Sequence, residues 1–68
     1  IMSTVSQRFA TNLKRLRTKM GLSQMDLSSK AGLDVTTINE LESGKRQPML
    51  KTTWKIANAL KVKTKDLL

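Results

Sequence analysis

Three glycines divide this chain into short stretches whose apolar residues recur with the period of an α-helix. Gly21, Gly32 and Gly44 each close one stretch, and glycine is the residue that most often ends a helix in a left-handed conformation. In the first stretch the apolar residues fall on one helix face; they are Val5, Phe9, Leu13, Leu16 and Met20. No stretch shows the alternation of a β-strand, so the sequence predicts an all-α fold.

The second stretch carries its own start signal. Ser23 and Asp26 have the spacing of a capping box, with aspartate in place of the usual glutamate. Leu22 and Leu27 are placed to form a hydrophobic staple across it. These signals predict a short second helix between Ser23 and Gly32.

Two further helices and a final turn are expected in the second half of the chain. Asp34 is a suitable cap for a helix that ends at Gly44, and Pro48 prevents its continuation. The next helix is expected from residue 49 or 50 to residue 60, followed by a last turn. Its inner residues are expected to be Leu50, Trp54, Ala57 and Leu60, with Ile56 beside them. Short loops between these segments predict one compact five-helix bundle over residues 1–68.

The composition excludes several classes of protein. The 68 residues include no Cys and no His, which removes disulfides, thiol nucleophiles and the commonest metal ligands. We therefore expect no metal, no cofactor and no enzymatic activity. No apolar run approaches the roughly 20 residues of a membrane span, and no secretion signal is apparent, so a cytoplasmic protein is expected. Ile1 precedes Met2, which suggests that Ile1 is a remnant of expression and that Met2 is the natural start.

The net charge of +8 indicates a polyanionic partner. Nucleic acid is the leading candidate and an anionic membrane surface the second, while a role in solubility alone is the neutral alternative. The membrane is disfavoured because the apolar helix faces match one another and leave no free amphipathic helix. Trp54 could stack on a base, but its place on an apolar face favours the core.

The middle of the chain, about residues 23–43, has the pattern of a helix-turn-helix. The ordered residues are Leu22-Ser23-Gln24-x-x-Leu27-x-x-x-Ala31-Gly32, followed by Ile38-x-x-Leu41-Glu42-x-Gly44-x-x-x-Pro48. This set resembles the Cro/CI-type helix-turn-helix family, which includes phage repressors, Cro proteins and restriction–modification controller proteins. The resemblance implies a lambda-repressor-like domain whose third helix reads double-stranded DNA. It also implies a transcriptional regulator of repressor or controller type.

The resemblance assigns a role in DNA binding to individual positions of this chain. The base-reading positions are Val35, Thr36, Asn39 and Glu40. The phosphate-contacting positions are Arg17, Ser23, Gln24, Thr37, Ser43, Lys45 and Arg46. Simpler roles remain open: a helix cap for Ser23, a half-buried position for Val35, a place in the turn for Thr37, and exposure to solvent for Asn39, Glu40, Arg17, Lys45 and Arg46. Glu40 needs a hydrogen-bond donor, because an acid beside phosphates is otherwise repelled.

Two further features follow from the resemblance. Arg17 and Glu42 match a family ion pair that joins the first helix to the end of the third. The family usually binds a palindromic operator as a homodimer, and the candidate dimer residues here are Val62, Leu67 and Leu68, with Leu67 the best candidate for a core role instead. An antitoxin-type interaction module, or the DNA-binding end of a longer regulator, are the alternatives. The sequence identifies no protein partner.

Overall fold

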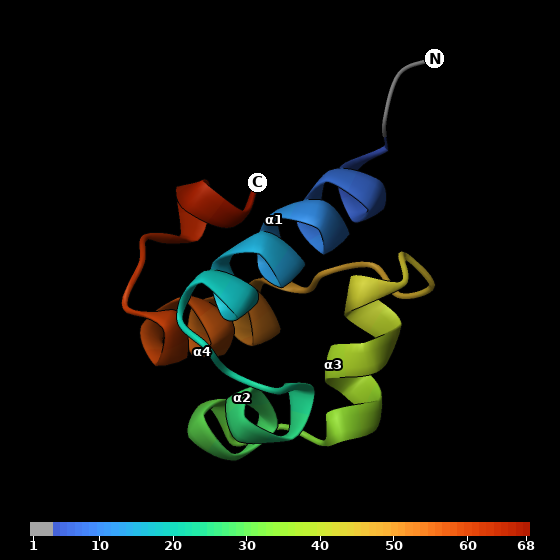
Figure 1. Ribbon diagram of the computed structural model, residues 1–68. Helices are drawn as coiled ribbons and strands as arrows, with labels where there is room; N and C mark the ends of the chain where they lie inside the picture. Colours follow the sequence, from blue (N-terminus) through green and yellow to red (C-terminus); the bar gives the residue numbers. More distant parts are fainter. Residues whose placement is uncertain (1–3) are drawn as a thin grey trace.

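Four α-helices and one 3-10 helix form the structure, a computed structural model that describes residues 4–68 (Figure 1). The elements are α1 (Val5–Lys19), α2 (Gln24–Ala31), α3 (Val35–Glu42), α4 (Leu50–Leu60) and the 3-10 helix η1 (Thr64–Leu67). These residues form no strand, and none of their helices has the length and apolarity to cross a membrane. The all-α prediction is confirmed, but the expected fifth helix is a single 3-10 turn. The expectation about Ile1 and Met2 lies outside the described residues.

One hydrophobic core joins every element. α1 packs on α3 and η1, and α4 packs on α2 and η1. Seven side chains in it are almost completely buried: Phe9, Leu13, Leu27, Ile38, Leu41, Ile56 and Leu67. α2 and α3 meet at a steep angle at one end of the molecule, with α1 and α4 on the other side of the core (Figure 1). The core therefore leaves one long side of α3 facing outward.

The inward face of α4 agrees only in part with the predicted one. Leu50 is 84% exposed and Trp54 is 60% exposed, although both were expected in the core. Ile56, Ala57 and Leu60 are buried as predicted, and Thr53 completes the buried face of α4. This helix has two overlapping apolar stripes, and helical spacing alone cannot tell which of them faces the core. Val5 and Met20, at the two ends of the first predicted apolar face, are also exposed.

The C-terminal turn closes the core. Leu67 is fully buried, and its carbonyl oxygen accepts a hydrogen bond from the side-chain amide of Asn12 at 3.1 Å. Val62 is half-buried and packs against the core, while Leu68 is 51% exposed. Leu67 is therefore unavailable as a dimer residue, because its side chain already fills the space between α1 and α4.

The helix ends follow the capping signals in part. Ser23 and Asp26 form the expected capping box at the start of α2, with both hydrogen bonds at 2.9 Å. Gly32 ends α2 in a left-handed conformation at φ 68°. Asp34 occupies the cap position of α3, but its side chain makes no capping hydrogen bond. α4 ends at a left-handed residue that no glycine marks, Lys61 at φ 58°.

Candidate nucleic-acid interface

The outward side of α3 presents a row of small, polar and hydrogen-bonding side chains. Ile38 and Leu41 anchor this helix in the core at 0% exposure. Because a helix turns by about 100° per residue, the side of α3 opposite Ile38 and Leu41 faces away from the core. Val35, Thr36 and Asn39 are exposed, and Thr37 and Glu40 are half-buried. The four expected base-reading residues thus share the side of α3 that leaves the core.

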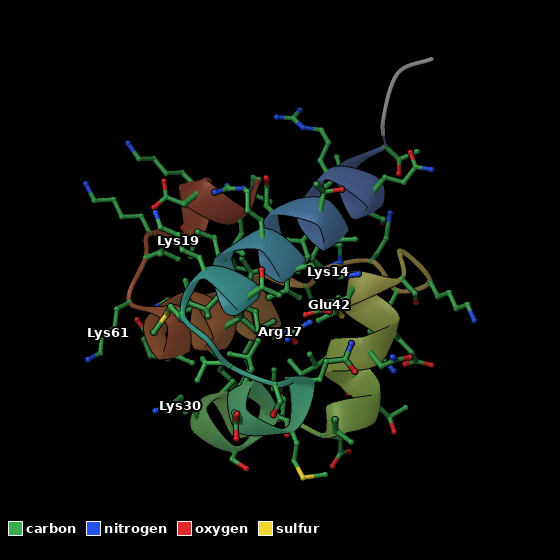
Figure 2. All side chains as sticks on the ribbon, viewed as in Figure 1. Lys14, Arg17, Lys19, Lys30, Glu42 and Lys61 are labelled. Carbon is green, nitrogen blue, oxygen red and sulfur yellow. The ribbon has the colours of Figure 1, made fainter. Side chains whose placement is uncertain are left out.

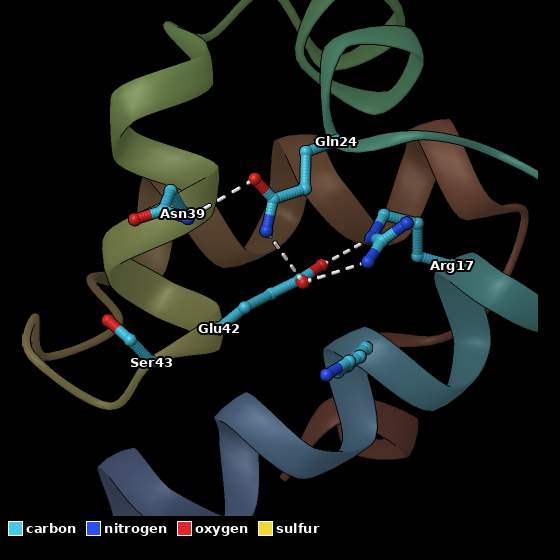
Figure 3. A pocket seen from close by; sticks show the side chains of 6 residues that line it. Arg17, Gln24, Asn39, Glu42 and Ser43 are labelled. Carbon is cyan, nitrogen blue, oxygen red and sulfur yellow. Dashed lines mark hydrogen bonds and ion pairs between the residues drawn. The ribbon is translucent and has the colours of Figure 1, made fainter.

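A hydrogen-bonded network joins α1, α2 and α3 beneath this surface (Figure 3). The Asn39 side-chain amide donates to the side-chain oxygen Oε1 of Gln24 at 3.3 Å. The Gln24 amide donates to Glu42 Oε1 at 3.0 Å, and Arg17 Nη2 donates to the same oxygen at 3.0 Å. These residues line an open cleft of about 330 Å³ together with Lys14 and Ser43. The network ties α3 to both neighbouring helices.

Arg17 and Glu42, expected as a pair, are in contact and largely removed from solvent. Their side chains are 11% and 4% exposed, and Arg17 Nε donates to the second carboxylate oxygen. Arg17 Nη1 donates to the backbone oxygen of Leu22 at 2.7 Å. The hydrogen bond to Glu42 raises the pKa of Arg17 despite the opposing effect of burial. The fork of Arg17 therefore holds the end of α3 and the turn before α2 in one arrangement.

Gln24 has a structural role that sequence reasoning missed. Its position at the start of α2 suggested only a phosphate contact, yet its side chain accepts from Asn39 and donates to Glu42. No local pattern in the sequence could reveal this, because the bonds depend on the angle at which α2 and α3 pack. The same bonds bring Asn39, an expected base reader, into contact with an expected phosphate residue.

Glu40 and Arg46 form a second, exposed ion pair. Arg46 Nη2 lies 2.7 Å from Glu40 Oε1, and the side chains are 51% and 37% exposed, respectively. Glu40 thus has the donor that it needed. Ser43 and Lys45 are also exposed, and the Ser43 hydroxyl donates to the Glu40 backbone oxygen at 3.1 Å. The loop after α3 therefore folds back on the helix that it follows.

The start of α2 lies beside this surface. The capping box occupies the amides of Ser23 and Asp26, whereas the first amides of a helix, here those of Gln24 and Met25, have no partner within the helix. Such amides favour an anion, with help from the helix dipole. Hydrogen bonds from Ser23 lower the pKa of the Asp26 carboxyl.

The positive charge of the chain is spread over several sides of the molecule. Lys14 and Arg17 lie where α1 approaches α3, close to Glu42 (Figure 2). Lys19, Lys30 and Lys61 lie on the opposite side of the same view from α3 (Figure 2). Lys14 and Arg17 line the cleft beside α3, and Arg46 lies on Glu40 of the same helix.

Known proteins share this sequence pattern and arrangement. A helix-turn-helix family model matches residues 13–67. An uncharacterized HTH-type transcriptional regulator from Archaeoglobus fulgidus is 37% identical over 57 residues, which cover 84% of this chain and 81% of that protein. One from Methanocaldococcus jannaschii is 42% identical over 55 residues, covering 81% of this chain and 83% of that protein.

A solved structure gives the same result for the fold. The restriction-modification controller protein C.AhdI from Aeromonas hydrophila superposes with a TM-score of 0.89 at 35% sequence identity. The match covers 93% of this chain and 96% of that one. Since the family match spans most of the chain and these relatives align over four fifths or more of their own length, the chain belongs to the helix-turn-helix family of DNA-binding transcriptional regulators.

Proposed function

We propose that this protein is a sequence-specific regulator that inserts α3 into the major groove of double-stranded DNA. The observation that carries the proposal is the outward side of α3, which is short, exposed and rich in hydrogen-bonding groups, while its inner side is fixed in the core. An α-helix fits the major groove, where each base pair presents a distinct set of donors and acceptors. Bound at an operator, the protein acts by blocking or recruiting RNA polymerase.

The base-reading residues of the proposal are Val35, Thr36, Asn39 and Glu40. Asn39 can pair with the N6 and N7 edge of adenine, and Val35 and Thr36 can contact a thymine methyl group. The bond from Asn39 to Gln24 supports this role, because it orients an exposed side chain before DNA arrives. A pre-oriented side chain loses less conformational entropy on binding.

The phosphate contacts of the proposal flank α3 on both sides. Ser23 and Gln24 contribute from the start of α2, and Thr37 from α3 itself. Ser43, Lys45 and Arg46 contribute from the loop. Arg17 is the weakest of these candidates for a DNA phosphate contact, because its guanidinium already donates to Glu42 and to the backbone oxygen of Leu22. These contacts supply most of the affinity and set the position of α3 on the duplex.

Homodimerisation on a palindromic operator completes the proposal. A domain of this size makes few base contacts by itself, and two-fold dimers place two such domains about one helical turn apart on DNA. Val62 and Leu68 remain candidates for the dimer surface. A second candidate is the exposed apolar stripe of Leu50 and Trp54, four positions apart on α4 and next to the exposed Met49. The expected location of such a DNA-binding regulator stays the cytoplasm.

Selection of bound duplexes from a random pool tests this function. The proposal expects a palindromic consensus whose half-sites are about one helical turn, or a multiple of it, apart. Recovery of a pool with no base preference, under moderate salt, would refute sequence-specific reading. A consensus without two-fold symmetry would instead refute the dimer and leave base reading intact.

A further inference from the structure

Glu40 and Arg46 form an ion pair at a place where an acid by itself would weaken DNA binding. Arg46 Nε and Nη2 both donate to the same carboxylate oxygen of Glu40, Oε1, at 3.0 and 2.7 Å. Within residues 4–68, the other oxygen of Glu40 and the Nη1 group of Arg46 make no hydrogen bond. The pair therefore leaves one acceptor and one donor group free at the exposed surface.

The turn after α3 explains why the pair forms. Gly44 adopts φ 76°, the left-handed conformation of a helix-ending turn. The amide of Lys45 donates to the Glu40 backbone oxygen at 3.0 Å, and that of Gly44 donates to the Leu41 oxygen at 3.3 Å. These two bonds reverse the chain and bring Arg46, the next residue, back over the side chain of Glu40. The position of Arg46 is thus built into the end of the helix.

We propose that Glu40 and Arg46 act as one base-reading unit that selects cytosine. Arg46 neutralises and orients the Glu40 carboxylate, and the free oxygen Oε2 accepts a hydrogen bond from a cytosine N4 amino group. Adenine also offers an amino group in the major groove, but its neighbouring N7 is an acceptor that repels a carboxylate. The inference rests on the proposed function and changes it at one residue: Arg46 becomes a positioning residue for Glu40 in place of the phosphate contact assigned to it above.

The unit has an electrostatic consequence that a phosphate contact lacks. While Glu40 holds Arg46, the two charges cancel, so Arg46 contributes little to general attraction for DNA. Replacing Glu40 with the uncharged Gln removes the carboxylate and releases Arg46 to phosphate. Glu40→Gln is therefore expected to strengthen binding to random DNA several-fold and to steepen its salt dependence by about one phosphate contact.

The test compares four variants of the whole chain: Glu40→Gln, Arg46→Gln, the double variant, and the control Lys45→Gln. Lys45 neighbours Arg46 and carries the same charge, but its side chain takes no part in the pair. Affinities are measured for the selected operator, for operators with each base substituted in turn, and for a random duplex. Thermal unfolding checks that each variant is folded.

We expect one operator position at which the wild-type protein prefers cytosine by about tenfold or more. Arg46→Gln is expected to abolish that preference although Glu40 is still present, and Glu40→Gln is expected to abolish it as well. The double variant is expected to lose no more selectivity than either single variant. Lys45→Gln is expected to weaken binding to all duplexes alike and to leave the preference in place.

Two results would overturn the inference while leaving the proposed function standing. One is that Arg46→Gln weakens every duplex equally, as Lys45→Gln does, and keeps the preference for cytosine. The other is that the operator has base preferences but none for cytosine that depends on Glu40. If the wild-type protein binds all duplexes equally, the proposed function itself fails and the inference fails with it.

Discussion

At the scale of single residues, the two ion pairs of α3 are opposite in character. Arg17 and Glu42 are almost enclosed, with side chains 11% and 4% exposed, whereas Arg46 and Glu40 are 51% and 37% exposed. Breaking a buried pair leaves an uncompensated charge in a medium of low polarity and costs about 3–5 kcal/mol. An exposed pair contributes about 1 kcal/mol or less. The Arg17–Glu42 pair therefore stabilises the fold, whereas the Glu40–Arg46 pair contributes little to stability and is accessible to DNA.

This difference predicts the result of two double-mutant cycles measured by denaturant unfolding. Arg17→Met and Glu42→Gln are each expected to lower the free energy of unfolding by about 3 kcal/mol, because each leaves one buried charge alone. The double variant is expected to lose much less than the sum. Glu40→Gln and Arg46→Gln serve as the matched control, with a coupling of about 0.5 kcal/mol. Equal couplings in the two cycles would contradict the assigned roles.

The capping box of α2 predicts a dependence of stability on pH. The Asp26 carboxyl has an ordinary pKa of 3.8, and its hydrogen bonds with Ser23 lower that pKa in the folded state. A group whose pKa is lowered by folding stabilises the fold above its unfolded pKa and loses that contribution as the pH falls through the folded pKa. Asp26→Asn is therefore expected to lower the melting temperature at pH 6 and to reduce the further decrease below about pH 4.

Thermal unfolding between pH 2 and pH 7 measures this effect. Asp34→Asn is the control, because Asp34 occupies a cap position without a side-chain capping bond. It is expected to melt near the wild-type temperature at pH 6. An Asp26→Asn protein with the full acid dependence of the wild type would show that the capping box does not contribute to it.

At the scale of the elements, local signals predict the helices, and packing decides their faces. The spacing of Phe9 and Leu13 on α1, and of Ile38 and Leu41 on α3, correctly identifies the buried faces, because each of these helices has one apolar stripe. α4 has two, and the prediction combined them: Ile56, Ala57 and Leu60 are buried as expected, whereas the structure places Leu50 and Trp54 in solvent. The final turn was likewise too short for its helix type to be predicted.

The candidate site divides in the same way. The exposed row on α3 and the Arg17–Glu42 pair could be expected from the sequence, since helix periodicity and the family resemblance indicate them. The bridging role of Gln24 and the Glu40–Arg46 pair could not. The first depends on the packing of α2 against α3, and the second depends on the left-handed turn at Gly44.

The residue that ends α4 has a strained backbone conformation. Lys61 adopts the left-handed conformation at φ 58°. Two backbone hydrogen bonds close the turn there: the Lys61 amide donates to the Asn58 oxygen, and the Val62 amide donates to the Ala57 oxygen. A side chain in this conformation costs about 1–2 kcal/mol that glycine avoids. Glycine is also more flexible in the unfolded chain, which offsets part of this gain. Lys61→Gly is therefore expected to raise the free energy of unfolding by about 1 kcal/mol.

Lys55→Gly, a substitution of the same type inside α4, is the control for this prediction. Glycine in a helix interior costs about 1 kcal/mol relative to a good helix former. The two variants are thus expected to shift the denaturation midpoint in opposite directions. A loss of stability in Lys61→Gly would contradict the account of how α4 ends.

At the scale of the whole molecule, the exposed apolar residues predict self-association. Leu50 and Trp54 form one stripe on α4, and the half-buried Val62 and the exposed Leu68 precede and follow η1 in the chain. We expect a weak dimer in free solution that a palindromic duplex tightens, since DNA holds two protomers side by side. Trp54→Lys and Leu68→Lys are expected to differ in sedimentation, with the larger loss of dimer marking the surface in use.

Lys14→Gln is the control, because Lys14 is exposed and lies on α1, away from both apolar surfaces in the sequence. It is expected to sediment as the wild-type protein does. One protomer per duplex for the wild type, even on a site with two half-sites, would contradict the dimer and leave DNA binding in place.

Base reading by α3 can be measured in a single titration experiment. The wild-type protein and the Thr36→Ala and Asn39→Ala variants are titrated with the selected operator and with a scrambled duplex of the same length and salt. Each substitution is expected to cost about 1–3 kcal/mol on the operator and almost nothing on the scrambled duplex. Equal losses on both duplexes would contradict base reading by α3 and reduce its role to contact with the phosphate backbone.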